Sequence, residues 1–320
     1  SPRYSQVLLN GALTPSAEPD VRSFSFDIVP SGLIEEITVT KVPVPHLPGD
    51  FSGGMVQIKT LDIPERDITQ MSYNTSWRVG TTLMGDFKSD EQYTGDYFGD
   101  GSAERELFNT FPADLGAEDI TRQERVDWGE LMPNTWAPQD LAAIPDQRAS
   151  VLFSRAFGKN IKVGTTTALR YSLTNQYFQA KRLNYEFSQA GEDIDTIFDY
   201  TDQQYERSVR VGALHNWTVQ FNRNHRLKID GLFNQNGLSQ VTERSGFDID
   251  NQQEVQNYAL RYRTRRLLTA NLSGEHLFLA QKLKLDWGAG IGQSGFEEPD
   301  FRLMAYQREA GSEGDRKSVV

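Results

Sequence analysis

Apolar and polar residues alternate with a period of two through four consecutive segments of this chain of 320 residues. The segments are 209–221, 225–245, 256–279 and 282–306. In the first segment the mostly apolar positions are Val209, Val211, Ala213, His215, Trp217, Val219 and Phe221. Successive side chains of a β-strand point to opposite faces of its sheet, whereas a helix repeats every ~3.6 residues. The pattern therefore predicts a mostly β protein whose long strands have one apolar and one polar face.

The turns between these strands indicate an up-and-down antiparallel arrangement. We expect about seven strands, at residues 70–83, 147–158, 161–188, 195–221, 225–245, 256–279 and 282–306. Short connections fall at every second junction, near 158–160, 222–224 and 280–282, whereas the intervening connections (84–146, 189–194, 246–255 and 307 onward) are longer or polar. A transmembrane β-barrel has this asymmetry, with short periplasmic turns and long extracellular loops. Several strands exceed the ~9–11 residues that cross a bilayer, so we expect them to project above it.

A barrel in a membrane would place its apolar strand faces against lipid and its polar faces inward. We therefore expect a set of apolar side chains near the short turns to be exposed on the outer surface: Trp217, Val219, Leu227, Ile229, Leu283, Leu285 and Trp287. The inward faces would carry polar residues such as Arg210, Asn216 and Gln220.

The composition at first argues against a membrane protein. Hydrophobic residues make up 38% of the chain, and its mean hydropathy is −0.56. No segment approaches the ~18 consecutive apolar residues of a transmembrane helix. A barrel removes this conflict, because only alternate residues face lipid and the backbone hydrogen bonds are satisfied between strands. The absence of cysteine excludes disulfides and thiolate metal sites.

The segment 22–64 precedes the first long strand and differs from it in character. Pro30-Ser31-Gly32 predicts the start of a short helix with Ser31 as its N-cap, and Glu35 and Glu36 would lie in the first turns, where the helix dipole favours carboxylates. The β-branched residues 37–40 then predict a strand. Three prolines within 43–48 prevent regular pairing, and Gly53-Gly54 gives the backbone freedom before a strand at 55–60. An ordinary αβ loop of a soluble domain is the alternative interpretation.

Three sequence pieces in this region resemble the end of the plug domain of TonB-dependent outer-membrane receptors. They are YSQVLLNG (4–11), FDIVPSGLIEEITVTK (26–41) and LPGDFSGGMVQIKT (47–60), and NTWAP (134–138) adds a weaker likeness. The resemblance implies that residues 1–66 are the C-terminal part of a small α/β plug and that residues 67–320 begin a barrel of about 22 strands. The plug-motif residues that it implies are Asp27, Pro30, Ser31, Lys41, Gly49, Phe51, Gly53, Gly54 and Thr60.

The same resemblance implies energy-coupled import of a ligand across the outer membrane of a Gram-negative bacterium. The plug would gate the barrel when an inner-membrane TonB complex pulls on an N-terminal motif, which this chain does not contain. We expect the chain to be a fragment, without a signal peptide and with on the order of 450 residues following Val320, at about 30 residues per strand. Lipid and a surface lipoprotein or another protein are the further partners that we expect.

Two structural alternatives to import stay open at this stage. The first is a receptor-like outer-membrane barrel that acts as a structural or assembly scaffold for a surface or periplasmic protein. The second is a soluble β-rich binding module such as an adhesin, although four strands of alternation and their length argue against it. A net charge of −11 argues against nucleic acid as a partner.

The sequence contains no catalytic constellation, so we expect no enzymatic activity. The four histidines lack ligand spacing, and we expect structural or interfacial roles and no metal site for His46, His215, His225 and His276. No cofactor is expected. The acidic segments 96–104 and 248–251, the latter with Glu254, contain oxygen ligands of the kind that calcium takes, but they lack the spacing of a calcium loop, so solvated surface is the favoured interpretation.

Two sets of residues are candidates for ligand binding. Arg261, Arg263 and Arg265 point one way from a predicted strand, where they can attract an anionic ligand or pair with plug carboxylates such as Asp27 or Asp50; pairing is favoured. The loop 84–146 carries several aromatic residues, namely Tyr93, Tyr97, Phe98, Trp128 and Trp136. These rings can stack on a glycan or siderophore, or can anchor the loop to itself. We expect this loop to determine ligand discrimination.

Overall fold

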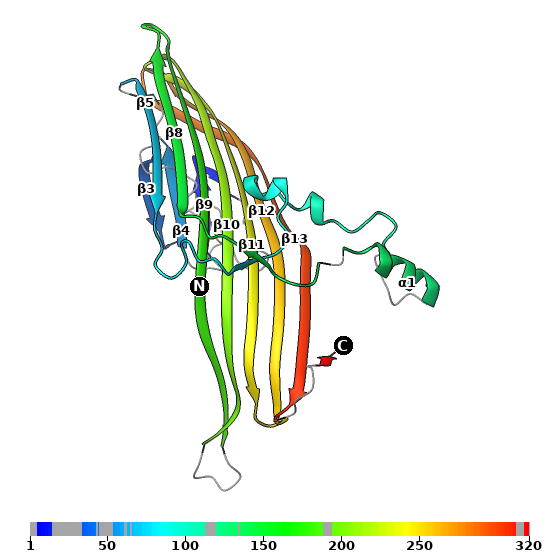
Figure 1. The fold of residues 1–320 in the computed structure, drawn as a ribbon. Helices are drawn as coiled ribbons and strands as arrows, with labels where there is room; N and C mark the ends of the chain where they lie inside the picture. Colours follow the sequence, from blue (N-terminus) through cyan, green and yellow to red (C-terminus); the bar gives the residue numbers. More distant parts are fainter. Residues whose placement is uncertain are drawn as a thin grey trace.

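The chain is mostly β, and its strands form one large sheet, one small sheet and a two-stranded ribbon (Figure 1). A computed structural model describes residues 5–14, 34–42, 44, 54–60, 63–64, 66–112, 120–133, 135–187, 194–311 and 317–319. The large sheet has eight strands in antiparallel order. From one edge to the other these are β14 (Lys317–Val319), β13 (Leu283–Glu309), β12 (Gln253–Phe278), β11 (His225–Asp248), β10 (Ile194–Asn222), β9 (Lys162–Phe187), β8 (Asp146–Phe157) and β5 (Ile68–Ser76). Among the described residues, no helix is long and apolar enough to span a membrane.

The seven longer strands confirm the antiparallel sheet that the period-two pattern predicts. The short connections 158–161, 223–224 and 279–282 all lie at one end of the sheet, as expected. Several boundaries were wrong by three residues or more, and the strand predicted at 282–306 extends to Glu309. The strand predicted at 70–83 ends at Ser76, because 79–83 forms a turn in which Gly80 has a φ of 80°. The loop predicted at 246–255 shrinks to 249–252, because β11 and β12 stay paired as far as Asp248 and Gln253.

The small sheet consists of four strands from the N-terminal region. Its order is β2 (Ala12–Leu13), β1 (Ser5–Leu9), β4 (Gly54–Thr60) and β3 (Ile34–Thr40). The helix predicted around Glu35 and Glu36 is wrong, because both residues belong to β3, where β-branched neighbours favour a strand and Glu36 lies 3.4 Å from Lys59 of β4. The predicted N-cap, Ser31, lies outside the described residues.

One face of the large sheet carries the small sheet, and we call it the inner face. Val7, Leu9 and Ile58 of the small sheet are buried against apolar side chains of β9 to β12. The large-sheet residues of this core are Ala168, Leu214, Leu232 and Leu267. The N-terminal region was predicted to contact the polar strand faces that carry Arg210 and Asn216. It does lie on this face, but the centre of the contact is apolar.

A buried lysine of β11 joins the two sheets. Lys228 donates hydrogen bonds from Nζ to Asn10 Oδ1 (3.2 Å), to the Thr60 carbonyl oxygen (3.1 Å) and to Thr60 Oγ1 (3.2 Å). Asn10 also accepts a hydrogen bond from the Thr60 backbone N–H at 2.9 Å. A methionine at position 228 would remove the charged donor from all three acceptors, although Asn10 Oδ1 would keep the Thr60 N–H.

We expect Lys228→Met to weaken the docking of the small sheet by about 1–3 kcal/mol. Hydrogen exchange of the backbone amides of β1 and β4 measures this loss as faster exchange. Lys284→Met is the matched control, because Lys284 is an exposed lysine of β13 that pairs with Asp286 at 2.7 Å. Equal exchange in the two variants would contradict the role of Lys228.

The opposite, outer face of the large sheet carries the long connection between β5 and β8. This connection contains β6 (Phe87–Ser89), η4 (Thr94–Phe98), η5 (Ala103–Arg105), α1 (Arg122–Leu131) and β7 (Gln139–Leu141). Phe87 and Ala143 pack against an aromatic and aliphatic patch of Tyr205, Val241 and Leu260 on β10, β11 and β12. We call residues 81–105 the outer loop. The helix α1 extends sideways away from the sheet (Figure 1).

The two coverings lie on opposite faces and at different heights of the same strands. On β10 the buried positions are odd from Tyr205 to Val209 and even from Leu214 to Thr218. No bulge intervenes, because β10 and β11 pair residue by residue from Phe198 to Gln220. The change of buried parity therefore marks the height at which the covering passes from the outer loop to the small sheet.

Candidate functional site

A row of three arginines lies on the inner face of β12. The row is Arg261, Arg263 and Arg265, and it alternates with Leu260, Tyr262 and Thr264, which are buried on the outer face. Because alternate residues of a strand point to opposite faces, all three guanidinium groups share the face of the small sheet. The sequence prediction that they point one way agrees with this register.

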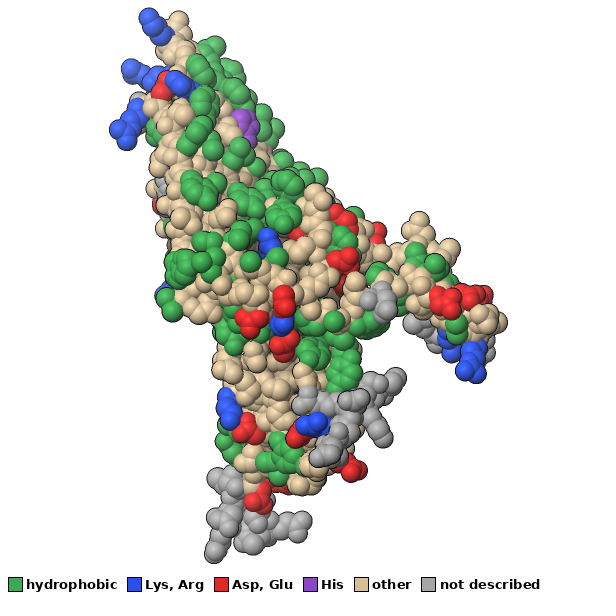
Figure 2. Space-filling model, in the orientation of Figure 1, with side chains coloured by type: hydrophobic (Ala, Val, Ile, Leu, Met, Phe, Trp, Pro, Cys, Tyr) green, Lys and Arg blue, Asp and Glu red, His purple; other side chains and the backbone are tan. Residues whose placement is uncertain are grey.

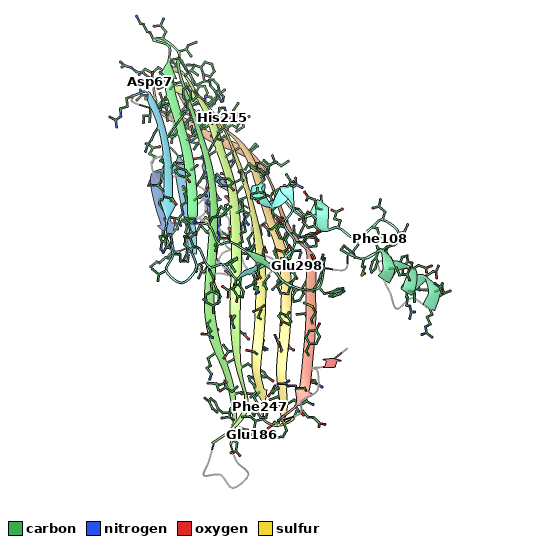
Figure 3. The ribbon with its side chains drawn as sticks, in the orientation of Figure 1. Asp67, Phe108, Glu186, His215, Phe247 and Glu298 are labelled. Atoms are coloured by element: carbon green, nitrogen blue, oxygen red, sulfur yellow. The ribbon has the colours of Figure 1, made fainter. Side chains whose placement is uncertain are left out.

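Neighbouring strands supply partners for this row. The Nη2 of Arg261 lies 2.5 Å from Glu298 Oε2 on β13, and Figure 3 labels Glu298 near the middle of the sheet. Arg263 donates a hydrogen bond to Gln240 Oε1 at 3.4 Å on β11. The predicted pairing with Asp27 or Asp50 involves residues outside the described part of the chain.

Further arginines extend the row across the sheet. Arg265 lies opposite Asn236, and Asn236 lies opposite Arg210, so the two arginines stand at one height on β12 and β10. Arg170 of β9 lies opposite Gly212. We call these five residues the inner arginine group: Arg170, Arg210, Arg261, Arg263 and Arg265. Guanidinium groups fixed on rigid strands create a positive potential and suit carboxylate or phosphate ligands.

The outer loop is held by a buried arginine that the sequence analysis did not single out. Arg105 Nη2 lies 2.8 Å from Asp90 Oδ2, and Arg105 Nη1 lies 2.6 Å from Asp96 Oδ1. The arginine side chain is 1% exposed. Its guanidinium also lies over the ring of Tyr262, 3.8 Å from the centroid, and over that of Tyr93 at 4.7 Å. This arrangement fixes the outer loop to β12.

The charge state of this cluster follows from its geometry. Burial alone would lower the pKa of Arg105, but the hydrogen bonds and charges of Asp96 and Asp90 raise it. Burial also raises the pKa of Tyr93 to about 12. The arginine therefore stays charged and the tyrosine neutral throughout the physiological range.

The loop aromatics mostly anchor the loop. Tyr93 stacks on Arg105 within the loop, and the ring of Tyr97 lies 5.2 Å from the guanidinium of Arg207 on β10. The contacts of these two rings favour the anchoring interpretation. Phe98 differs, because it is 62% exposed and is the aromatic ring of this segment with the most surface to offer a partner.

The two predicted ligand sets do not meet. The aromatic residues 93–98 lie on the outer face, whereas the inner arginine group lies on the face of the small sheet. The sheet itself separates them. A ligand bound to the aromatic residues therefore does not contact the inner arginine group within the described part of the chain, and the reverse also holds.

Three of the predicted plug-motif residues lie in the described part of the chain. Thr60 is buried and bonded to Asn10 and Lys228, Gly54 begins β4 with a φ of 138°, and Lys41 is exposed after β3. The remaining predicted residues lie outside the described part of the chain, namely Asp27, Pro30, Ser31, Gly49, Phe51 and Gly53. The Asn10-Gly11 pair is a turn signal that sequence reasoning passed over.

The acidic segments suggested for calcium make contacts of their own. Asp96 pairs with Arg105, Glu104 accepts a hydrogen bond from the Gly95 N–H, and Glu254 Oε2 lies 2.6 Å from Arg308. Asp248 accepts a hydrogen bond from the Asn251 N–H at 3.1 Å within the tight turn. Within the described ranges, no group of three or more His, Cys, Asp or Glu side chains is arranged to hold a metal ion.

The histidines correct one interpretation of the sequence. His225 and His276 are not isolated, because β11 and β12 pair them directly and their Nδ1 atoms lie 3.1 Å apart. His215 on β10 contacts Thr167 Oγ1 at 2.8 Å, and its ring centroid lies 5.9 Å from that of Trp217. His46 lies outside the described residues.

No protein-family profile, curated protein or solved structure matches this chain. The function proposed below therefore rests on the geometry of the protein's surfaces.

Proposed function

We propose that this chain is part of an outer-membrane β-barrel of the TonB-dependent receptor type, which takes up a ligand by energy-coupled import. In this proposal the large sheet is a section of the barrel wall, and the small sheet belongs to the plug that gates it. The inner arginine group faces the lumen, and the short turns face the periplasm. The transported ligand passes the inner face, where arginines favour anionic groups.

The observation that carries the membrane proposal is the length of the uncovered outer face. Between the outer loop and the short turns, the outer face is free over 210–222 on β10, 225–234 on β11 and 267–278 on β12. Each stretch is close to the ~9–11 residues that a tilted strand needs to cross a bilayer. The outer loop begins where such a bilayer would end.

The side chains on this free surface are those that lipid would accept. We call them the outer apolar band: Met71, Tyr73, Phe153, Phe157, Leu169, Trp217, Phe221, Ile229, Leu268, Leu272, Phe278, Leu283, Leu285, Trp287 and Ile291. Figure 2 shows hydrophobic side chains gathered over this end of the sheet. Five of the seven side chains expected at the lipid face are exposed, and Val219 and Leu227 are half-buried. A water-soluble protein rarely leaves so large an apolar surface uncovered.

The helix of the connection between β5 and β8 also supports the scaffold alternative. The helix α1 extends beyond the sheet, and none of its residues is buried. Thr121 and Glu124 cap it reciprocally, since the Thr121 N–H donates to Glu124 Oε2 at 2.8 Å and the Glu124 N–H donates to Thr121 Oγ1 at 3.2 Å. A capped helix that extends away from the large sheet offers an accessible surface for binding a protein partner.

Single-cysteine labelling tests the membrane topology, because the chain has no cysteine of its own. Lys159→Cys lies in a short turn, and Asp250→Cys lies in the turn at the opposite end. In intact cells that express the full-length protein, a membrane-impermeant maleimide should label position 250 and not position 159. Both should react after the outer membrane is permeabilised. Labelling of both positions in intact cells, or of neither after permeabilisation, would contradict the proposed topology.

A comparison of culture media separates import from scaffolding. Import predicts that cells with the gene deplete a compound from the medium, detected by mass spectrometry, and that cells lacking either the gene or the inner-membrane energy-transducing complex do not. A scaffold predicts no such compound. It predicts instead that a surface protein is lost when α1 is deleted.

A further inference from the structure

Two histidines at the turn end of β11 and β12 lie in hydrogen-bond contact with each other. His225 is the first residue of β11, and His276 lies two residues before the end of β12. Their Nδ1 atoms lie 3.1 Å apart, and both rings belong to the outer face, where Trp287 stacks on His276 at an interplanar angle of 19°. Phe278 lies 5.2 Å from His225, measured between ring centroids.

The distance between the two nitrogens fits coordination of one ion. Imidazole nitrogens bind zinc at about 2.0–2.1 Å. Two such nitrogens lie about 2.9 Å apart at a right angle and about 3.3 Å apart at the tetrahedral angle. The observed separation of 3.1 Å falls between these values. Binding of one ion by both Nδ1 atoms requires that the protons of both neutral rings lie on Nε2.

We propose that His225 and His276 bind a divalent transition-metal ion across the strand pair. Two neutral imidazoles prefer Cu²⁺ to Zn²⁺ and Ni²⁺. They prefer all three of these ions to Mg²⁺ or Ca²⁺. No third protein ligand stands beside the pair among the described residues, so water or an added ligand completes the coordination. The bound ion joins the ends of two strands beside the connections 223–224 and 279–282. This inference does not depend on the import proposal.

Metal titration of the full-length protein in detergent tests the site, with Cu²⁺ and Zn²⁺ as the probes. We expect one equivalent of Cu²⁺ to bind, Zn²⁺ to bind more weakly, and copper to quench the fluorescence of the nearby Trp287. His225→Asn and His276→Asn should each weaken copper binding at least tenfold. His215→Asn is the matched control, because His215 lies on the same outer face with Thr167 as its hydrogen-bond partner.

Electron paramagnetic resonance of the copper-loaded protein gives a second readout. Two bound imidazoles predict hyperfine structure from two nitrogens, reduced to at most one in either single variant. The inference is overturned if the unmodified protein binds no copper, if all four proteins bind it equally, or if only one of the two histidine variants loses binding. Equal circular-dichroism spectra of the four proteins establish that a loss is not caused by misfolding.

Discussion

Replacing Arg105 by methionine should release the outer loop from the large sheet. The substitution removes the partner of two buried carboxylates, Asp90 and Asp96, and it also removes the guanidinium that lies over Tyr262. Removal of one partner from a buried ion pair costs about 3–5 kcal/mol, because the remaining charge loses its compensation in a medium that solvates it poorly. Faster proteolysis and faster hydrogen exchange within 81–105 would measure the release.

A matched variant and a rescue distinguish this effect from a general loss of charge. Arg122→Met removes an arginine of the same connection that is exposed on α1, so it should leave the outer loop in place. Combining Arg105→Met with Asp90→Asn and Asp96→Asn removes the buried negative charges and should recover part of the docking. If Arg105→Met behaves like Arg122→Met, the buried cluster does not hold the loop.

Much of the large sheet could be predicted from the sequence, because its strands obey a strict period of two. The segment 225–245 was predicted to within three residues of β11, since Asn222 to Asn224 form a turn and the alternation begins directly after it. The first strand was predicted less well. Trp77 and Val79 continue the alternation, but Gly80 turns the backbone away before the predicted end at residue 83.

The coverings of the sheet could not be predicted in the same way. Alternation assigns residues to two faces, but it does not reveal which face is covered at a given height. Val209 and Trp217 share one face in the sequence pattern, yet Val209 is buried beneath the outer loop and Trp217 is 42% exposed. This difference arises from contacts between segments that are more than a hundred residues apart, such as the hydrogen bond from the Gly101 N–H to Tyr262 Oη.

The site residues show the same limit. The arginine row of β12 was visible because its members are two residues apart on one strand. The pair of His225 and His276 was not, because 51 positions separate the two residues and only the register of β11 with β12 brings them together. Arg105 carried no local signal, since its partners Asp90 and Asp96 belong to an acidic stretch typical of solvated surface.

Replacing Ile229 by arginine should hinder membrane insertion. Ile229 is 57% exposed in the outer apolar band, opposite Trp217 on β10 and Leu272 on β12. It lies near the middle of the free stretch 225–234, so a bilayer that fills this stretch would place it close to the midplane. An arginine at the midplane of a transmembrane barrel costs about 2–4 kcal/mol. Folding of the full-length protein into lipid vesicles, followed as a function of urea concentration, measures this cost.

Ser245→Arg is the control that makes this result decisive. Ser245 lies on the same strand and, by its odd position, on the same face, and it is exposed beyond the part of β11 that the outer loop covers. An arginine there stays in water in the proposed membrane position, so folding should be unchanged. In a water-soluble sheet both residues would be ordinary exposed positions, and Ile229→Arg would be neutral or would improve solubility. A cost that appears only at position 229, and only with lipid, therefore separates a lipid-facing wall from a soluble one, whereas equal behaviour of the two variants would remove the basis for placing this sheet in a membrane.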